Sequence, residues 1–160
     1  MKRKVFVALV LFLFTFTSIA AVALAKPIIK ADTTYYDINT GLYVLKGNVY
    51  VEVKDRIITA GVARVSMGSL EVWGSEGITL TQGGISLVAD RVHVYGTENR
   101  AVIDGNVNFK QTDLTIVADK ADFDWRTKLG VFSGNVQITQ GNSSWSADSA
   151  TYNVETNTLL

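Results

Sequence analysis

Residues 118–140 read ADKADFDWRTKLGVFSGNVQITQ and form the clearest copy of a unit that recurs along most of the chain. The Ala-Asp pair that opens this copy returns in fixed steps of 29 residues. Its other copies are Ala31-Asp32, Ala89-Asp90 and Ala147-Asp148, with Ala60-Gly61 completing the series. A constant period without insertions is typical of a repeat architecture, in which each unit packs on the next.

A second landmark keeps the same period. Gly134-Asn135-Val136 has copies at Gly47-Asn48-Val49 and Gly105-Asn106-Val107, and the remaining place is taken by Glu76-Gly77-Ile78. Two landmarks with one period strengthen the assignment of tandem 29-residue repeats.

Apolar and polar side chains alternate between these landmarks, as in VYVEVK at residues 49–54, which predicts strands with one covered face. Turn residues separate runs of about a dozen residues, which is long for a strand. The apolar phase switches at Ala-Asp, because Ile116 and Ala118 are out of phase with Ala121 and Phe123. We therefore predict a β-bulge at each Ala-Asp, with Gly-Asn bending the neighbouring strand. The expected fold is all-β, a bent, two-layered antiparallel meander extended along one axis.

Composition excludes several classes of function. The 160 residues contain no cysteine and one histidine, so thiolate chemistry and His-rich metal sites are absent. We expect His93 to be an ordinary strand residue without a partner, and Asp32, Asp90, Asp119 and Asp148 to be turn or bulge residues. No catalytic residue, metal ligand or cofactor is predicted. Without the three basic residues near the N-terminus, 12 basic and 15 acidic residues remain, which argues against nucleic acid as a partner.

Residues 1–25 have the three parts of an export signal. Lys2, Arg3 and Lys4 precede an apolar stretch at 5–23, and Ala23-Leu24-Ala25 supplies a small-x-small cleavage pattern. The alternative is an uncleaved anchor, because about 20 apolar residues can span a bilayer. In both cases we expect residues 26–160 to form one domain outside the cytoplasm.

The apolar inner face is the remaining candidate site. A closed core is the ordinary expectation, but stacked two-layer units can instead open along one side as a lengthwise groove. We predict two facing walls for this groove. One wall consists of Ile58, Leu87, Ile116 and Trp145, and the other of Val49, Val51, Ile78, Leu80, Val107, Phe109, Val136 and Ile138.

The two halves of the unit, Ala-Asp-x-Ala-x-Phe/Tyr and Gly-Asn-Val, resemble the repeat of the OstA-like (organic solvent tolerance) family. The closest matches are VADKADFD at 117–124 and SADSATYN at 146–153, and the resemblance covers residues 31–160. It implies a twisted, open β-jelly roll whose subunits join end to end. It also implies that acyl chains lie in an apolar groove while the sugar head group stays in water.

The function implied by this resemblance is that of a non-enzymatic periplasmic bridge or chaperone for lipopolysaccharide or a similar multi-acyl lipid. Its expected partners are other OstA-like proteins, namely copies of itself and transport components of the inner and outer membranes. The last repeat stops mid-unit, which predicts an edge strand for such pairing. If the leader is not cleaved, an inner-membrane-anchored component is expected instead.

Two alternatives from other classes remain open. A secreted β-solenoid or adhesin-like scaffold predicts parallel strands around a closed, dry core. A carbohydrate-active β-helix requires paired carboxylates, for which Asp90 and Asp119 are the candidates.

Overall fold

The computed structural model of this protein describes residues 28–53 and 55–160, so the predicted export signal at 1–25 lies outside the described residues. The described residues form a 13-stranded antiparallel sheet and one short 3-10 turn, which confirms the predicted all-β fold. The elements are β1 (Ile28–Lys30), β2 (Thr33–Asp37), β3 (Leu42–Val53), β4 (Arg56–Ser66), β5 (Glu71–Ser75), β6 (Ile78–Gln82), β7 (Ile85–Ala89), β8 (Arg91–Tyr95), η1 (Gly96–Glu98), β9 (Arg100–Gln111), β10 (Leu114–Asp124), β11 (Leu129–Gln140), β12 (Ser143–Asn153) and β13 (Thr158–Leu159).

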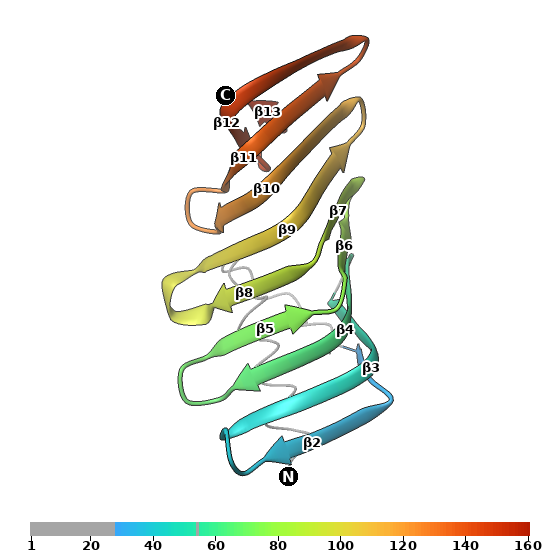
Figure 1. The fold of residues 1–160 in the computed structure, drawn as a ribbon, viewed down its shortest axis with the longest axis vertical. Helices are drawn as coiled ribbons and strands as arrows, with labels where there is room; N and C mark the ends of the chain where they lie inside the picture. The colour runs from blue at the N-terminus through green and yellow to red at the C-terminus, as the bar shows by residue number, and fades with distance from the viewer. Residues whose placement is uncertain (1–27, 54) are drawn as a thin grey trace, which may run out of the picture.

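The strands follow one another along the long axis of the molecule, from β2 at one end to β12 at the other (Figure 1). Their order in the sheet is the order in the chain, apart from β2, β6 and β7, which pair beside the main path. Every recorded pairing is antiparallel, which agrees with the predicted meander.

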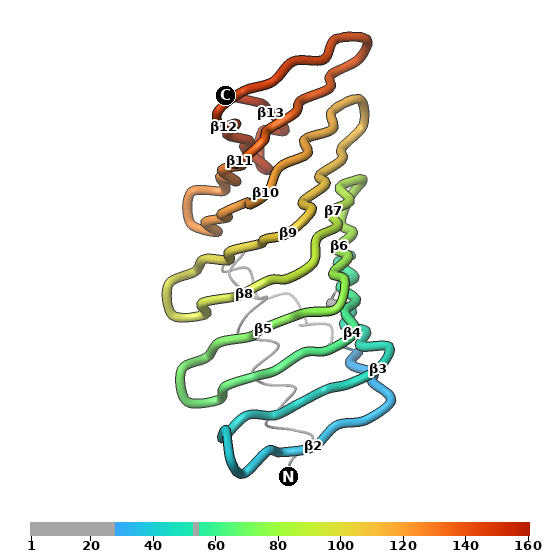
Figure 2. Tube along the Cα trace, viewed as in Figure 1, coloured from blue at the N-terminus to red at the C-terminus, as the bar shows by residue number. Residues whose placement is uncertain are grey.

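The long strands bend midway, and their two halves belong to different layers. The first half of β4 pairs with β6 and its second half with β5, while β9 pairs first with β8 and then with β7. Figure 2 shows the trace turning within β9. We call β2, β5, β8 and the halves that continue them the front layer, and β1, β6, β7 and the other halves the back layer. The line where the layers meet is the crease.

The register of the sheet shifts at the crease, as the sequence predicts. Gly105 and Asn106 of β9 lie between the pairs Val107–Ala118 and Asp104–Lys120, so two residues oppose one. The extra residue is therefore on the Gly-Asn strand, and its predicted place at Ala-Asp is wrong. The reason is backbone conformation: Gly105 has φ +80° and Asn106 φ +50°, a combination that Gly and Asn adopt more readily than other residues.

A carboxylate from the neighbouring strand covers each regular bulge. The side-chain amides of Asn48, Asn106 and Asn135 donate to Oδ2 of Asp32, Asp90 and Asp119 at 3.0, 2.8 and 2.7 Å. The predicted structural role of this aspartate series is thus confirmed for these three positions. A ladder of cross-strand hydrogen bonds runs along the crease.

The two exceptions in the repeat, Gly61 and Glu76, contact each other. Gly61 stands in the aspartate position and Glu76 in the glycine position, so the carboxylate has moved to the opposite strand. A Cβ atom at Gly61 would lie 2.5 Å from Cβ of Glu76, so a side chain fits on only one strand. The strand pairs on either side break at Glu76-Gly77 and at Asp90, so the runs predicted to hold about a dozen residues become β5 to β8 with five residues each.

Candidate functional site

A cavity of about 610 Å³ lies between the front and back layers. Its size is within the roughly 300–1,000 Å³ range of small-molecule sites. The back layer contributes apolar side chains such as Ile58 and Leu80, and the front layer contributes Val65, Val72 and Val94. The strand alternation places these side chains inward, and the bend turns the two apolar faces toward each other.

Seven of the predicted groove residues line this cavity: Val49, Val51, Ile58, Ile78, Leu80, Leu87 and Phe109. Four others, Val107, Ile116, Val136 and Ile138, are at most 3% exposed and do not reach the cavity. Trp145 does not line it either and is 39% exposed on β12. The structure therefore brings the predicted residues together only in part.

The prediction of two facing walls is wrong. Ile58 lies directly opposite Leu80 on the paired strands β4 and β6, and Leu80 opposite Leu87 on β7. The residues assigned to the two walls are thus neighbours in the back layer, because both sets lie on the same side of the crease. The true opposite wall is the front layer. Its signal in the sequence was the phase switch, which places Ala63 and Val65 on the inner face beyond the bend.

Small side chains make room for the cavity. Ala60, Ala63, Gly74 and Ala101 all line it. At Gly74 a Cβ atom would lie 2.9 Å from Ile78 Cδ1 and from Val92 Cγ1, so a larger residue there would require these side chains to shift. The interior around these positions forms the open half of the molecule.

Three aromatic rings close one end of the cavity. Phe109 of the back layer contacts Phe132 and Tyr152 of the front layer, with ring centroids 5.6 and 4.9 Å apart. We call these three residues the stopper. Beyond it, Val107 and Ile116 are 0% exposed within a continuous apolar core. This part of the interior is the sealed half.

Polar groups surround the mouth of the cavity. Nε2 of Gln111 donates to Oδ1 of Asn157 at 2.6 Å and links the end of β9 with the β12–β13 turn. Nε of Arg56 donates to Oε1 of Gln82 at 2.8 Å, and burial lowers the pKa of the Arg56 guanidinium. Lys128 lies on the cavity lining as well. An apolar interior with a polar mouth suits an amphipathic guest.

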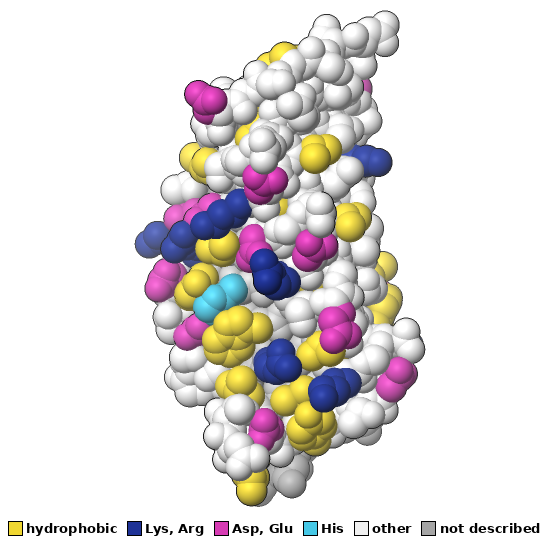
Figure 3. Space-filling view, viewed as in Figure 1, with side chains coloured by type: hydrophobic (Ala, Val, Ile, Leu, Met, Phe, Trp, Pro, Cys, Tyr) yellow, Lys and Arg dark blue, Asp and Glu magenta, His cyan; other side chains and the backbone are white. Residues whose placement is uncertain are grey.

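The outer face of the front layer gathers charged and aromatic side chains (Figure 3). His93 stacks on Trp73 with ring centroids 4.8 Å apart and lies 3.8 Å from the ring of Tyr95. Its Nε2 lies 2.6 Å from Oε2 of Glu71, and this hydrogen bond lowers the pKa of Glu71. The expectation that His93 has no partner is wrong, because its partners Trp73 and Glu71 lie on the neighbouring strand β5 and are distant in sequence.

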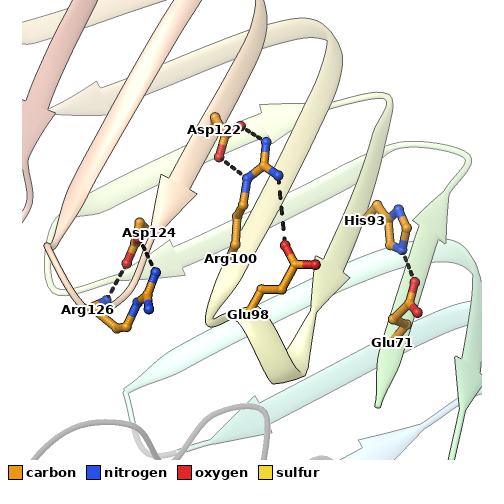
Figure 4. A network of polar contacts seen from close by, with 7 residues as sticks. All are labelled: Glu71, His93, Glu98, Arg100, Asp122, Asp124 and Arg126. Atoms are coloured by element: carbon orange, nitrogen blue, oxygen red, sulfur yellow. Dashed lines mark hydrogen bonds and ion pairs between the residues drawn. The ribbon is translucent and has the colours of Figure 1, made fainter. Parts of the chain in front are cut away.

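Ion pairs continue this surface toward β10 (Figure 4). Arg100 binds Asp122 through two nitrogens, and this hydrogen bonding lowers the pKa of Asp122 and raises that of Arg100. Asp124 binds Arg126 at 3.2 Å, which lowers the pKa of Asp124. These carboxylates are ionised partners in cross-strand and turn contacts, a role that stabilises the sheet surface.

Residues 28–53 and 55–160 contain neither a membrane-spanning helix nor a cluster of candidate metal ligands. No helix in that part is long and apolar enough to cross a membrane. No three His, Cys, Asp or Glu side chains gather there as candidate metal ligands.

Comparison with known proteins gives matches of two kinds, to a family model and to solved structures. A family model described as "LptA/(LptD N-terminal domain) LPS transport protein" matches residues 115–158. The fold is similar to the crystal structure of LptH, the LptA homologous periplasmic component of the lipopolysaccharide transport device from Pseudomonas aeruginosa. That match has a TM-score of 0.53 and 18% sequence identity, and it covers 61% of this chain and 75% of LptH. No curated protein matches the sequence.

The two matches agree with each other and with the repeat. The matched segment contains the copies at 117–124 and 146–153 on which the resemblance was based. The similar structure is an LptA homologue with the same all-β architecture. The resemblance of this chain to the OstA-like family is therefore confirmed, and its fold is that of an LptA-type β-jelly roll.

Proposed function

We propose that this protein binds lipopolysaccharide or a similar multi-acyl lipid between its two layers and helps to transfer it across the periplasm. The observation that carries this proposal is the apolar cavity with its polar mouth. The matched family and LptH are both described as lipopolysaccharide transport components, which supports the same function and a non-enzymatic role.

The energetics of lipid transfer favour such a cavity. Each methylene group exposed to water costs about 0.8 kcal/mol, so a twelve-carbon chain costs about 10 kcal/mol. A lipid with several chains cannot cross an aqueous space unshielded. A cavity that covers acyl chains while the head group stays in water lowers this barrier.

The free edge of the sheet supports end-to-end pairing with another OstA-like protein. Among the described residues, β13 pairs only with Tyr152 and Asn153, so the first half of β12 carries no neighbour on that side. Trp145 lies in this half, and an exposed strand edge is a template for an added strand. Copies of this chain and the membrane-bound transport components are the proposed partners. The location in the periplasm, the single domain at 26–160 and the leader at 1–25, cleaved or kept as an inner-membrane anchor, remain predictions.

The alternatives receive less support. A β-solenoid scaffold predicts parallel strands, whereas all recorded pairings are antiparallel. The β-helix enzyme requires Asp90 and Asp119 to act as a pair, yet each of them accepts a hydrogen bond from its own crease asparagine.

Paired variants on β6 test the proposal. Leu80→Asp places a carboxylate on the cavity wall, where an unpaired charge and an acyl chain exclude each other. Thr81→Asp places the same charge on the outer face of the same strand. We expect saturable lipopolysaccharide binding to the wild type and to Thr81→Asp, and binding at least about tenfold weaker for Leu80→Asp.

The affinities are measured by equilibrium binding of purified lipopolysaccharide, with the signal corrected for light scattering. Circular dichroism checks that each variant is folded. Absence of saturable binding to the wild type, or an equal loss in both variants, contradicts the proposed function.

A further inference from the structure

We propose that the stopper formed by Phe109, Phe132 and Tyr152 sets the length of the apolar chain that the cavity accepts. This inference rests on the proposed function and assigns a specificity-determining role within it. It implies a cavity with one blind end, rather than a groove that runs the full length of the molecule.

The stopper joins the two layers across the interior. Phe109 projects from the back-layer half of β9, whereas Phe132 and Tyr152 project from the front-layer halves of β11 and β12. All three line the cavity, and each is at most 3% exposed. Tilted ring pairs at these distances attract one another by about 0.5–1.5 kcal/mol. The rings therefore form a defined end wall.

The side chains behind the rings are buried and do not line the cavity. Val107 and Ile116 are 0% exposed and Val136 is 1% exposed, and none of the three lines the cavity. Such interiors are packed at the density of organic crystals, so an entering chain has to displace side chains. An acyl chain that reaches the stopper has to turn back or leave its end in water.

A polar bridge closes the mouth at the same level. Asn157 Oδ1 accepts hydrogen bonds from Nε2 of Gln111 at 2.6 Å and from the hydroxyl of Tyr152 at 3.4 Å. Burial raises the pKa of Tyr152, so its hydroxyl stays protonated and able to donate at neutral pH. Tyr152, which forms part of the end wall of the cavity, is thus hydrogen-bonded to Asn157 at the mouth.

The cavity does not end in this way on its other side. Its lining continues through Val65 and Ala60 to Leu45, Val49 and Val51. A guest is therefore expected to lie with its chain ends against the stopper and its remaining length toward β3.

A chain-length series tests this arrangement. The probes are straight-chain saturated fatty acids from octanoate to stearate, and the measured quantity is the affinity of the purified protein for each of them. For the wild type we expect about a fourfold gain per methylene until the chain fills the cavity, and then no further gain. Phe109→Ala removes the end wall, so the length at which the gain stops should increase.

Two further variants keep the test decisive. Phe109→Leu removes less volume and serves if Phe109→Ala does not fold. Phe123→Ala removes the same ring from the side wall, and it should change affinities throughout the series without moving the length limit.

The possible results separate the two proposals. A limit that moves in the Phe109 variants and stays in Phe123→Ala supports the stopper. A limit that is missing in the wild type, or unchanged in a folded Phe109 variant, refutes the stopper while lipopolysaccharide binding leaves the proposed function standing. If the wild type binds neither the fatty acids nor lipopolysaccharide, the proposed function itself fails.

Discussion

The open and sealed halves are built from the same repeat, yet the apolar cavity described above lies in only one of them. In the sealed half, β9 to β12 are continuous strands of 11 or 12 residues whose creases carry the regular Gly-Asn bulge. In the open half, the crease at Gly61 and Glu76 is reversed and the strands β5 to β8 have five residues each. Ala60, Ala63 and Gly74 face the cavity there, whereas Ile116 and Ile138 fill the other interior.

The inner residues of a repeat therefore decide whether the space between the layers is a packed core or a cavity. Strand pairing and bulges provide two facing layers in both halves. Large apolar side chains then fill the space between the layers, or small ones leave it empty. The cost of an unfilled interior is acceptable only where a guest can occupy it.

The largest effect on stability should come from removing volume in the sealed half. Ile116→Ala leaves a void in a core residue that is 0% exposed, and we expect a loss of about 2–5 kcal/mol in the free energy of unfolding. Leu80→Ala enlarges a cavity that already exists, so its cost should be clearly smaller. Urea denaturation of both variants measures the difference. Equal costs contradict the division into two halves.

The second-largest loss of stability is expected from substituting a glycine of the crease. Gly134 has φ +77°, and a Cβ atom there would lie 2.6 Å from Oδ2 of Asp119. Gly134→Ala should therefore cost about 1–3 kcal/mol in the free energy of unfolding. Gly77 has φ +81° with nothing within 4 Å of such a Cβ, so Gly77→Ala carries the backbone strain alone. Urea denaturation should show a smaller loss for Gly77→Ala, and a larger loss there would overturn the crease contact.

The reversed crease predicts a coupling between two substitutions. Gly61→Asp alone forces two carboxylates into one space, and Glu76→Gly alone removes the carboxylate altogether. Together they return the carboxylate and the glycine to the strands that carry them at the regular creases, so the double variant should be more stable than the sum of the single effects by about 0.5–3 kcal/mol. A double-mutant cycle of thermal unfolding measures this term. Additive effects would show that the two positions do not act together.

The smallest effect on stability concerns an ion pair on the outer face. Arg100 lowers the pKa of Asp122 below its ordinary value of 3.8. The stabilisation is therefore present above about pH 4 and is lost as the pH falls through the lower pKa of the folded protein. Asp122→Asn should flatten the dependence of the melting temperature on pH below about pH 4. An unchanged acid profile contradicts this assignment.

The sequence was sufficient for the strands, the bends and the family resemblance, because alternation and period are local patterns. It was not sufficient for the shape of the interior. The repeat period alone suggests that Ile58 and Val49 lie on facing walls, because the period does not show which strands belong to the same layer. In the sequence, Gly61 and Glu76 are two separate departures from the repeat. Their contact becomes visible only when the strands that carry them are paired. Whether Ile116 meets a guest or a neighbouring side chain depends on packing across the layers.

Site-specific photo-crosslinking to lipopolysaccharide tests the central claim most directly. A photoreactive amino acid is placed at Leu87 on the cavity wall, at Val88 on the outer face of the same strand, which is 45% exposed, or at Ile138 in the sealed half, which is 3% exposed. We expect lipid adducts at Leu87 and none above background at Val88 or Ile138. Adducts of equal yield at Ile138, or none at Leu87, would contradict a lipid site confined to the open half.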